Sequence, residues 1–252
     1  LHDALPICFP NPNITWETSE MFNIGIDASF FNGKLNLEAD WFYKKTNDIL
    51  RERTDMPAIL GYKLPAANVG KVDNRGIDLN ITHRNHLRDF NYSIAGNLTW
   101  ARNKVIDLLE PAGEKNNPRQ RSTGHSMSQY FGYEALGLFQ SDEEANNWPQ
   151  PQFGKAKAGD IKYKDQNGDG IIDAEDEIAI GRSNYPELVY GLNLNAEWKG
   201  FDITFFFQGA ALADFYYNGY LAFPYIEGRG GALLEHHIGN TWTPENPKAE
   251  FP

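Results

Sequence analysis

Three pairs of segments in this chain alternate apolar and polar residues, and a tight turn joins the two members of each pair. Successive side chains of a β-strand point to opposite faces, so a period of two predicts strands with one apolar and one polar face. The pairs are residues 21–30 with 35–43, 76–84 with 90–102, and 188–198 with 201–209. A tilted strand of about 9–11 residues is long enough to cross a bilayer. The chain is therefore predicted to be all-β, with about six membrane-length antiparallel strands.

The apolar faces begin or end in aromatic residues, as the aromatic girdles of outer-membrane barrels do at the two membrane interfaces. Asn32-Gly33 marks the first turn, because this dipeptide tolerates the positive φ angles of a type I′ hairpin. The aromatic residues are Phe30, Trp41, Tyr43, Phe90, Trp100, Trp198 and Phe201.

The polar faces carry carboxylates at regular positions, namely Asp27, Glu38, Asp40, Asp78, Glu197 and Asp202. They show neither a paired spacing nor a nucleophile with its base, so we expect no enzyme activity.

The connections fall into a short class and a long class. The short ones are residues 31–34, 85–89 and 199–200, and the long ones are 47–67, 103–186 and 213–252. Outer-membrane barrels have short periplasmic turns and long external loops. This asymmetry predicts a partial transmembrane β-barrel with long extracellular loops, the largest an excursion over about residues 103–186. Within it we expect local β-structure over residues 130–139 and a short helix capped by Ser141.

Composition excludes several other classes of protein. The 252 residues carry a net charge of -11, which argues against a nucleic-acid partner. No apolar run approaches the roughly 20 residues of a membrane helix, although a barrel hides its lipid face by alternation. Cys8 is the only cysteine, so there is no disulfide framework.

Residues 165–176 read DQNGDGIIDAED, which follows the calcium-loop pattern of an EF-hand. The flanking segments are strand-like rather than helical, so we expect a calcium-type loop inside a β protein. The expected ligands of a structural Ca²⁺ are Asp165, Asn167, Asp169, the Ile171 carbonyl, Asp173 and Asp176. The alternative is a turn ordered by hydrogen bonds from its own Asn, Asp and Gly residues.

Several segments in order resemble the SusC/RagA-type TonB-linked outer-membrane transporters (TonB-dependent receptors). Residues 68–79 read NVGKVDNRGIDL, similar to a barrel-strand segment of that family, and residues 11–27 and 40–50 resemble the strands before it. The family's external block is similar to residues 130–140 followed by 159–181. The likeness implies that residues 9–252 are an internal fragment of the C-terminal barrel. Residues 1–8 resemble a translated sequencing adaptor, and we expect them to be an assembly artefact.

The resemblance also implies a function and partners. Its members import nutrients across the bacterial outer membrane, driven by TonB, and a SusD-like surface lipoprotein covers the extracellular mouth. The expected substrate is an oligosaccharide or a peptide, and the expected surroundings of the barrel are outer-membrane lipid. Aromatic candidates for substrate contact are Tyr216, Tyr217, Tyr220, Phe223 and Tyr225, which equally suit packing within a loop.

The alternative is a secreted, calcium-stabilised β-sandwich that binds carbohydrate. A sandwich buries the apolar faces of its strands between two packed sheets. A piece of a barrel leaves the same faces exposed on one open sheet. The fate of the apolar face therefore discriminates between the two hypotheses.

Overall fold

The computed structural model describes residues 11–52, 65–110, 119, 121–218, 222 and 233–252. The expected artefact at residues 1–8 lies outside the described residues. The chain divides into two compact units. The first comprises residues 1–112, 122–128 and 182–214, and the second comprises residues 113–121, 129–181 and 215–252.

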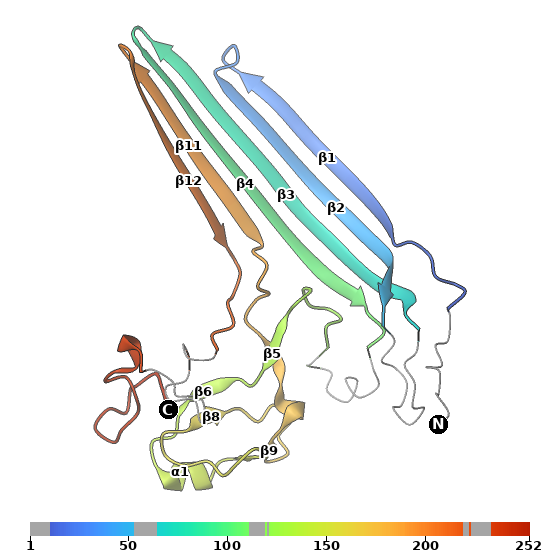
Figure 1. Cartoon of the computed structure of the whole chain (residues 1–252), viewed down its shortest axis with the longest axis vertical. Coiled ribbons are helices and arrows are strands. Elements are labelled where there is room, and N and C mark those ends of the chain that lie inside the picture. The colour runs from blue at the N-terminus through green and yellow to red at the C-terminus, as the bar shows by residue number, and fades with distance from the viewer. Residues whose placement is uncertain (1–10, 53–64, 111–118, 120, 219–221, 223–232) are drawn as a thin grey trace, which may run out of the picture. The chain divides into compact units, whose positions relative to one another are not determined.

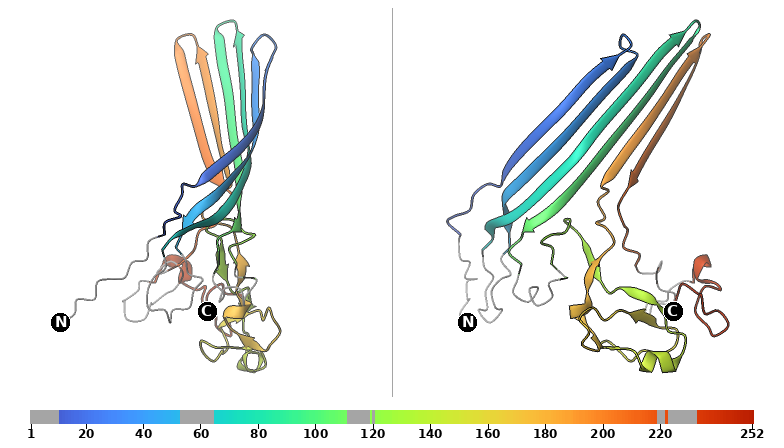
Figure 2. Two further views of the ribbon diagram at one scale, coloured as in Figure 1. Left: turned by 90° about the vertical axis from the view of Figure 1, so that its right-hand side faces the viewer. Right: turned by 180° about the vertical axis from the view of Figure 1, so that it is seen from behind.

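The first unit is a six-stranded antiparallel sheet in the order β1-β2-β3-β4-β11-β12. Figures 1 and 2 show its three tight turns at one end of the sheet. Strands β4 and β11 are neighbours although a long segment of chain separates them in the sequence. The strands are β1 (Thr18–Phe30), β2 (Leu35–Arg51), β3 (Ala67–Leu87), β4 (Phe90–Asp107), β11 (Leu188–Trp198) and β12 (Phe201–Ala211). All six predicted strands are confirmed.

The register of the sheet brings the six apolar faces together on one side. Ile24 lies opposite Trp41, and Trp41 lies opposite Ile77 on the other flank of β2. The same row continues through Trp100 to Leu188 on β11. A slip of one residue in any pair would turn one strand's apolar side chains to the polar face. The register therefore gives the sheet one apolar and one polar face, as the alternation predicts.

The strands extend further toward the long loops than the alternation indicates. β3 begins at Ala67 rather than at residue 76, and β2 continues to Arg51. Backbone pairing continues past the apolar stripe through register shifts near Ile49, because the ladder needs only N–H and C=O groups. The first turn is a four-residue loop in which Phe31, as well as Asn32 and Gly33, has a positive φ. The hairpin is confirmed, and Asn32 and Gly33 have the positive φ angles expected of its turn, which the Lys34 N–H closes by donating to the Phe31 carbonyl at 3.4 Å.

The apolar face is exposed across the whole sheet. On the edge strands Ile26 is 65% exposed and Phe201 76%, and on the interior strand β4 Ile94 is still 43% exposed. The only apolar side chains of this unit that are buried, among the described residues, are Val72 and Val105. The described part of the unit contains no second sheet packed on this face. The sandwich alternative is therefore not supported.

The second unit consists of short elements. Its two-stranded sheets pair β5 with β10, β6 with β8, and β7 with β9, the last in parallel. The predicted helix is α1 (Asp142–Asn146), and its N-cap Ser141 accepts a hydrogen bond from the Glu144 N–H at 3.1 Å. Phe139, Ala145 and Ala156 form a small core with Trp148 packed against it. The remaining elements are β5 (Tyr130–Gly132), β6 (Ala135–Leu138), β7 (Gln150–Pro151), β8 (Ile161–Tyr163), β9 (Ile171–Ile172), β10 (Ile178–Ile180) and the 3₁₀-helices η2 (Ala174–Asp176) and η4 (Glu235–His237).

Candidate functional site

The apolar face of the first unit has the chemistry of a lipid-contacting surface. Its six positions on β12 are Phe201, Ile203, Phe205, Phe207, Gly209 and Ala211. The four large side chains among them are each at least half exposed. An apolar surface that continues over six strands far exceeds the patches that monomeric soluble proteins expose. None of the described helices is long and apolar enough to span a membrane.

The polar face carries the predicted carboxylates among amide and hydroxyl side chains. Asn80 donates to Glu38 across β2 and β3 at 3.0 Å, and Thr99 donates to Asp78 at 2.7 Å. Asn91 donates to Glu197 at 3.2 Å. These are hydrogen bonds between neighbouring strands, which satisfy the carboxylates without assembling a reactive group. The face is therefore a polar wall whose carboxylates are linked from strand to strand.

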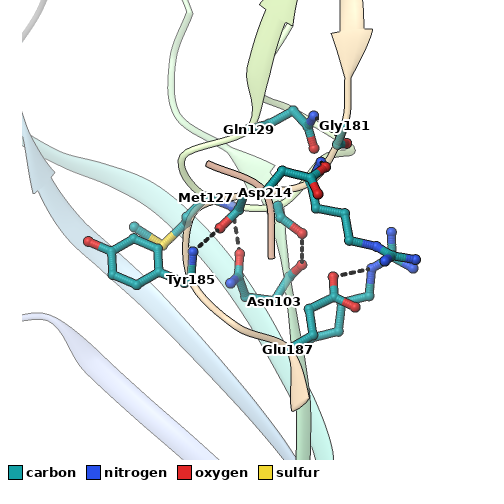
Figure 3. Close-up of polar contacts among 11 residues, drawn as sticks. Asn103, Met127, Gln129, Gly181, Tyr185, Glu187 and Asp214 are labelled. Atoms are coloured by element: carbon teal, nitrogen blue, oxygen red, sulfur yellow. Dashed lines mark hydrogen bonds and ion pairs between the residues drawn. The ribbon is translucent and has the colours of Figure 1, made fainter. Parts of the chain in front are cut away.

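The base of the long excursion is held by polar contacts (Figure 3). Within the first unit, the Met127 N–H donates to Asn103 Oδ1 at 2.6 Å, and the Arg102 guanidinium lies 3.3 Å from the Glu187 carboxylate. Asp214 accepts from the Arg182 N–H at 2.5 Å, and its own N–H donates to the Ser183 carbonyl at 3.2 Å. These contacts anchor the segments that enter and leave β4, β11 and β12.

Inside the second unit, one side chain joins the two ends of the excursion. The Gln129 carboxamide donates to the carbonyl oxygens of Ile180 at 2.9 Å and of Gly181 at 3.1 Å. Gln129 precedes β5 and Gly181 follows β10, and these two strands pair. The part of the excursion that belongs to the second unit, residues 129–181, therefore starts and ends on one hydrogen-bonded stem.

The acidic loop folds around its own backbone. Asp165 accepts from the N–H groups of Gly168 at 2.6 Å and Gly170 at 2.9 Å. Asp176 is fully buried, and it accepts from the Gln166 N–H at 2.7 Å and the Asp173 N–H at 3.0 Å. Gly168 and Gly170 both have positive φ, which glycine adopts without steric cost. The side chains predicted as ligands therefore act at least as caps of this turn.

The other predicted ligands take part in the same network. The Ile171 N–H donates to Asp169 Oδ1 at 2.9 Å, and the Asp169 N–H donates to Asn167 Oδ1 at 3.1 Å. Asp173 Oδ1 accepts from the Glu175 N–H at 2.8 Å and caps η2. Within the described residues, no three His, Cys, Asp or Glu side chains are arranged as a metal site. Calcium binding by this loop stays a prediction.

The electrostatics of Asp165 follow from these bonds. Burial raises the pKa of the Asp165 carboxyl, but the hydrogen bonds from the N–H groups of Gly170 and Gly168 outweigh it, so the pKa lies below its ordinary value. Glu144 is similar, because hydrogen bonds from the Lys162 ammonium and the Gln140 N–H lower the pKa of its carboxyl. Both carboxylates are therefore stabilised in the ionised form.

Two of the five aromatic candidates lie in the described residues, and both make contacts within the second unit. Tyr216 stacks on Tyr130 with ring centroids 5.8 Å apart, and the Tyr217 hydroxyl is hydrogen-bonded to His236 at 2.7 Å. Both tyrosines keep exposed area, at 59% and 45%. Tyr220, Phe223 and Tyr225 lie outside the described residues. Substrate contact by this group stays a prediction.

Two features of the second unit were not predicted from the sequence. Arg119 donates to the backbone carbonyls of Glu175 at 3.1 Å and Gln166 at 3.2 Å, so it ties the two ends of the acidic loop together. Tyr133, Phe153 and Tyr163 form a mutual aromatic cluster with ring centroids 5.3–6.0 Å apart. Neither group is contiguous in sequence, and no period or motif connects its members.

Comparisons with known proteins agree with this geometry. A family model described as "TonB dependent receptor-like, beta-barrel" matches residues 5–207. TonB-dependent receptor P26 of Formosa agariphila is 34% identical over 96% of this chain and 25% of the relative. TonB-dependent receptor SusC of Bacteroides thetaiotaomicron is 25% identical over 92% of this chain and 23% of the relative. This chain thus spans about a quarter of the length of these relatives.

Solved structures share the fold. The RagAB peptide importer in the "open-open" state superposes with a TM-score of 0.69 at 23% identity, covering 97% of this chain and 26% of that chain. The six-stranded sheet is thus part of a TonB-dependent receptor barrel, in which the alternation of each strand separates lipid from lumen. The family model covers most of the chain, and the two-faced sheet is what such a barrel requires. The chain belongs to the TonB-dependent receptor-like β-barrel family.

Proposed function

We propose that this chain forms part of the barrel wall of an outer-membrane transporter that imports glycan oligomers or peptides, driven by TonB. The observation that carries the proposal is the continuous two-faced sheet, apolar on one side and polar on the other over six strands. Such a wall separates lipid from an aqueous path. Its role is passage of a substrate rather than bond breaking.

Two further observations support the proposal. All three tight turns lie at one end of the sheet, which is the asymmetry of barrels with short periplasmic turns. One structural neighbour is the RagAB peptide importer, and another relative is the TonB-dependent receptor SusC. The partners that we propose are TonB on the periplasmic side and a SusD-like lipoprotein over the extracellular mouth.

The proposal is tested by deleting the complete gene in the source bacterium. Growth is then measured on polysaccharides, on protein hydrolysate and on the corresponding monomers as sole carbon sources. We expect growth to fail on one class of oligomer and to continue on its monomers, and a tonB deletion should give the same pattern. Normal growth of the deletion strain on every oligomer would contradict the proposed import.

The lipoprotein partner is tested separately. The full-length transporter, purified from outer membranes in mild detergent, should carry a SusD-like lipoprotein in equimolar amount. A transporter that purifies alone under conditions that keep the barrel folded would remove the lid from the proposal. It would leave the transport function to be decided by the growth experiment.

A further inference from the structure

The dipeptide Asn-Gly occurs three times in the chain, with its asparagine at Asn32, Asn167 and Asn218. Glycine has no side chain, so its backbone nitrogen is not shielded from the side chain of the residue before it. That nitrogen is therefore open to reaction with the carboxamide carbon of the asparagine. Gly219 lies outside the described residues, whereas both residues of the first two pairs are described. These two pairs lie in opposite surroundings.

The Asn32-Gly33 pair is exposed in the tight turn between β1 and β2. The turn is closed by its flanking residues, since the Lys34 N–H donates to the Phe31 carbonyl at 3.4 Å. Among the described residues, the Asn32 carboxamide and the Gly33 N–H have no hydrogen-bond partner. The carboxamide can therefore rotate toward the Gly33 nitrogen without breaking a hydrogen bond.

The charge around Asn32 favours attack by this nitrogen. Asn32 lines a cavity of about 480 Å³ together with Lys34 and Arg84. Attack removes the proton of the nitrogen and places negative charge on the carboxamide oxygen, and nearby cations stabilise both anionic species. Glu197 is the one carboxylate of the lining among the described residues, and it lies on β11, where it accepts a hydrogen bond from Asn91.

The Asn167-Gly168 pair is held at each reacting group. The Gly168 N–H donates to Asp165 Oδ1 at 2.6 Å. The Asn167 carboxamide donates to Asp169 Oδ2 at 3.0 Å and accepts from the Asp169 N–H at 3.1 Å. Glu175 Oε2 lies 3.4 Å from the same carboxamide nitrogen. Attack at this pair would break these bonds, and the surrounding carboxylates oppose loss of a proton from the Gly168 nitrogen.

We propose that Asn32 is a site of spontaneous deamidation and that the acidic loop protects Asn167 from the same reaction. The Gly33 nitrogen loses its proton to solvent base and bonds to Asn32 Cγ. The bond from Cγ to Nδ2 then breaks, and the amide nitrogen takes up a proton from water and leaves as ammonia. Water opens the cyclic imide at either carbonyl, which gives aspartate or β-linked isoaspartate with no change of oxidation state.

The products change the charge and the shape of the turn. Both place a carboxylate in the cavity that Lys34 and Arg84 line. The β-linked product also inserts a methylene carbon into the backbone of a turn in which Phe31, Asn32 and Gly33 all have positive φ. The reaction needs only water, so it is independent of the proposed transport.

The test compares the two pairs within one molecule. The full-length transporter in native outer membranes is kept in mildly alkaline buffer made with heavy-oxygen water, sampled over days, digested and analysed by mass spectrometry. Heavy oxygen enters the new carboxylate when the imide opens, which marks conversion that occurs during the incubation. Asn32 should convert roughly tenfold or more faster than Asn167, because a single hydrogen bond to a charged acceptor contributes at least about that factor. In urea, where the loop is unfolded, the two rates should approach each other.

A substitution in the acidic loop completes the experiment. Asp165→Ala removes the acceptor of the Gly168 N–H and should speed conversion of Asn167 while conversion of Asn32 stays unchanged. Asp78→Ala is the matched control, because it removes a carboxylate from the polar face of the sheet and should change neither rate. Conversion of Asn32 that is no faster than that of Asn167 in the folded transporter overturns the proposal, and so does an Asn167 that Asp165→Ala leaves unchanged.

Discussion

Phe205 and Phe206 allow the two faces of the wall to be tested with the same substitution on neighbouring residues. Phe205 lies on the apolar face of β12, opposite Leu194, and is 51% exposed. Phe206 lies on the polar face, opposite Asn193, and is 63% exposed. The residues match in type and strand, and they are both exposed. Only the face differs.

The expected cost of Phe205→Arg follows from its place in the strand. Phe205 is the third of six apolar-face positions on β12, which places it near the middle of the apolar band. An arginine at the bilayer midplane costs about 2–4 kcal/mol. Half of a phenylalanine surface is about 100 Å², so loss of its contact with lipid costs about 2.5 kcal/mol more. The free energy of unfolding should therefore fall by about 5 kcal/mol.

Phe206→Arg should incur neither the cost of an arginine in lipid nor the loss of contact between phenylalanine and lipid. An exposed substitution of this kind changes the free energy of unfolding by about 0.5 kcal/mol. The assay is refolding of the full-length transporter into liposomes at graded urea, with the folded fraction read from its heat-modifiable mobility in gels. We expect a large shift of the urea midpoint for Phe205→Arg alone. Equal losses in the two variants, or a larger loss for Phe206→Arg, would refute the assignment of the faces.

Three other predictions concern single positions. Gly76→Ala should destabilise the transporter by about 2 kcal/mol, because a Cβ there lies 2.4 Å from the Trp100 carbonyl oxygen. Gly96→Ala is the control, since the atom nearest to its added Cβ is 4.0 Å away, and it should be almost neutral in the same urea titration. Asp165→Ala should speed hydrogen exchange at the amides of Gly168 and Gly170 without changing the strands. Calcium binding is tested by calorimetry of the intact transporter. If millimolar calcium produces no heat, the loop is a turn only. The pKa of Asp165 is lowered in the folded loop, so its contribution to the stability of the loop is complete above the ordinary pKa of about 4 and is lost as the pH falls through the lower folded value. Pepsin should therefore cut this loop increasingly below about pH 4. Unchanged cleavage would count against the capping role.

The strands and their faces were predictable because both depend on local pattern. Alternation requires only the period of two, and a tight turn such as Asn32-Gly33 requires only two adjacent residues. The ends of the strands were less predictable. The part of β3 before Gly76 pairs by backbone hydrogen bonds that do not depend on apolar side chains. Sequence alternation therefore gives the membrane-crossing segment of a strand but not its full length.

The second unit was only partly predictable. The capped helix α1 and the β-structure after residue 130 have local signals. The parallel pairing of β7 with β9 involves two residues from each strand, too few for any period to show. Arg119 and Gln129 hold this unit through carbonyl oxygens that are 47 to 56 residues away in the sequence. A hydrogen bond from a side chain to a distant backbone carbonyl does not depend on the composition of either segment, so composition does not predict it.

One exception to alternation has a physical cause in a neighbouring glycine. Phe42 interrupts the polar face of β2, and it lies directly opposite Gly76, where its ring takes the space of the missing side chain. Tyr190 covers Gly209 in the same way on the apolar face. An aromatic ring over a glycine shields the exposed backbone of the strand and fills the gap in the face. A single sequence shows the glycine and the aromatic residue but not that the register makes them partners. The aromatic side chain of Phe42 on the polar face is therefore explained by the neighbouring strand β3 rather than by β2 itself.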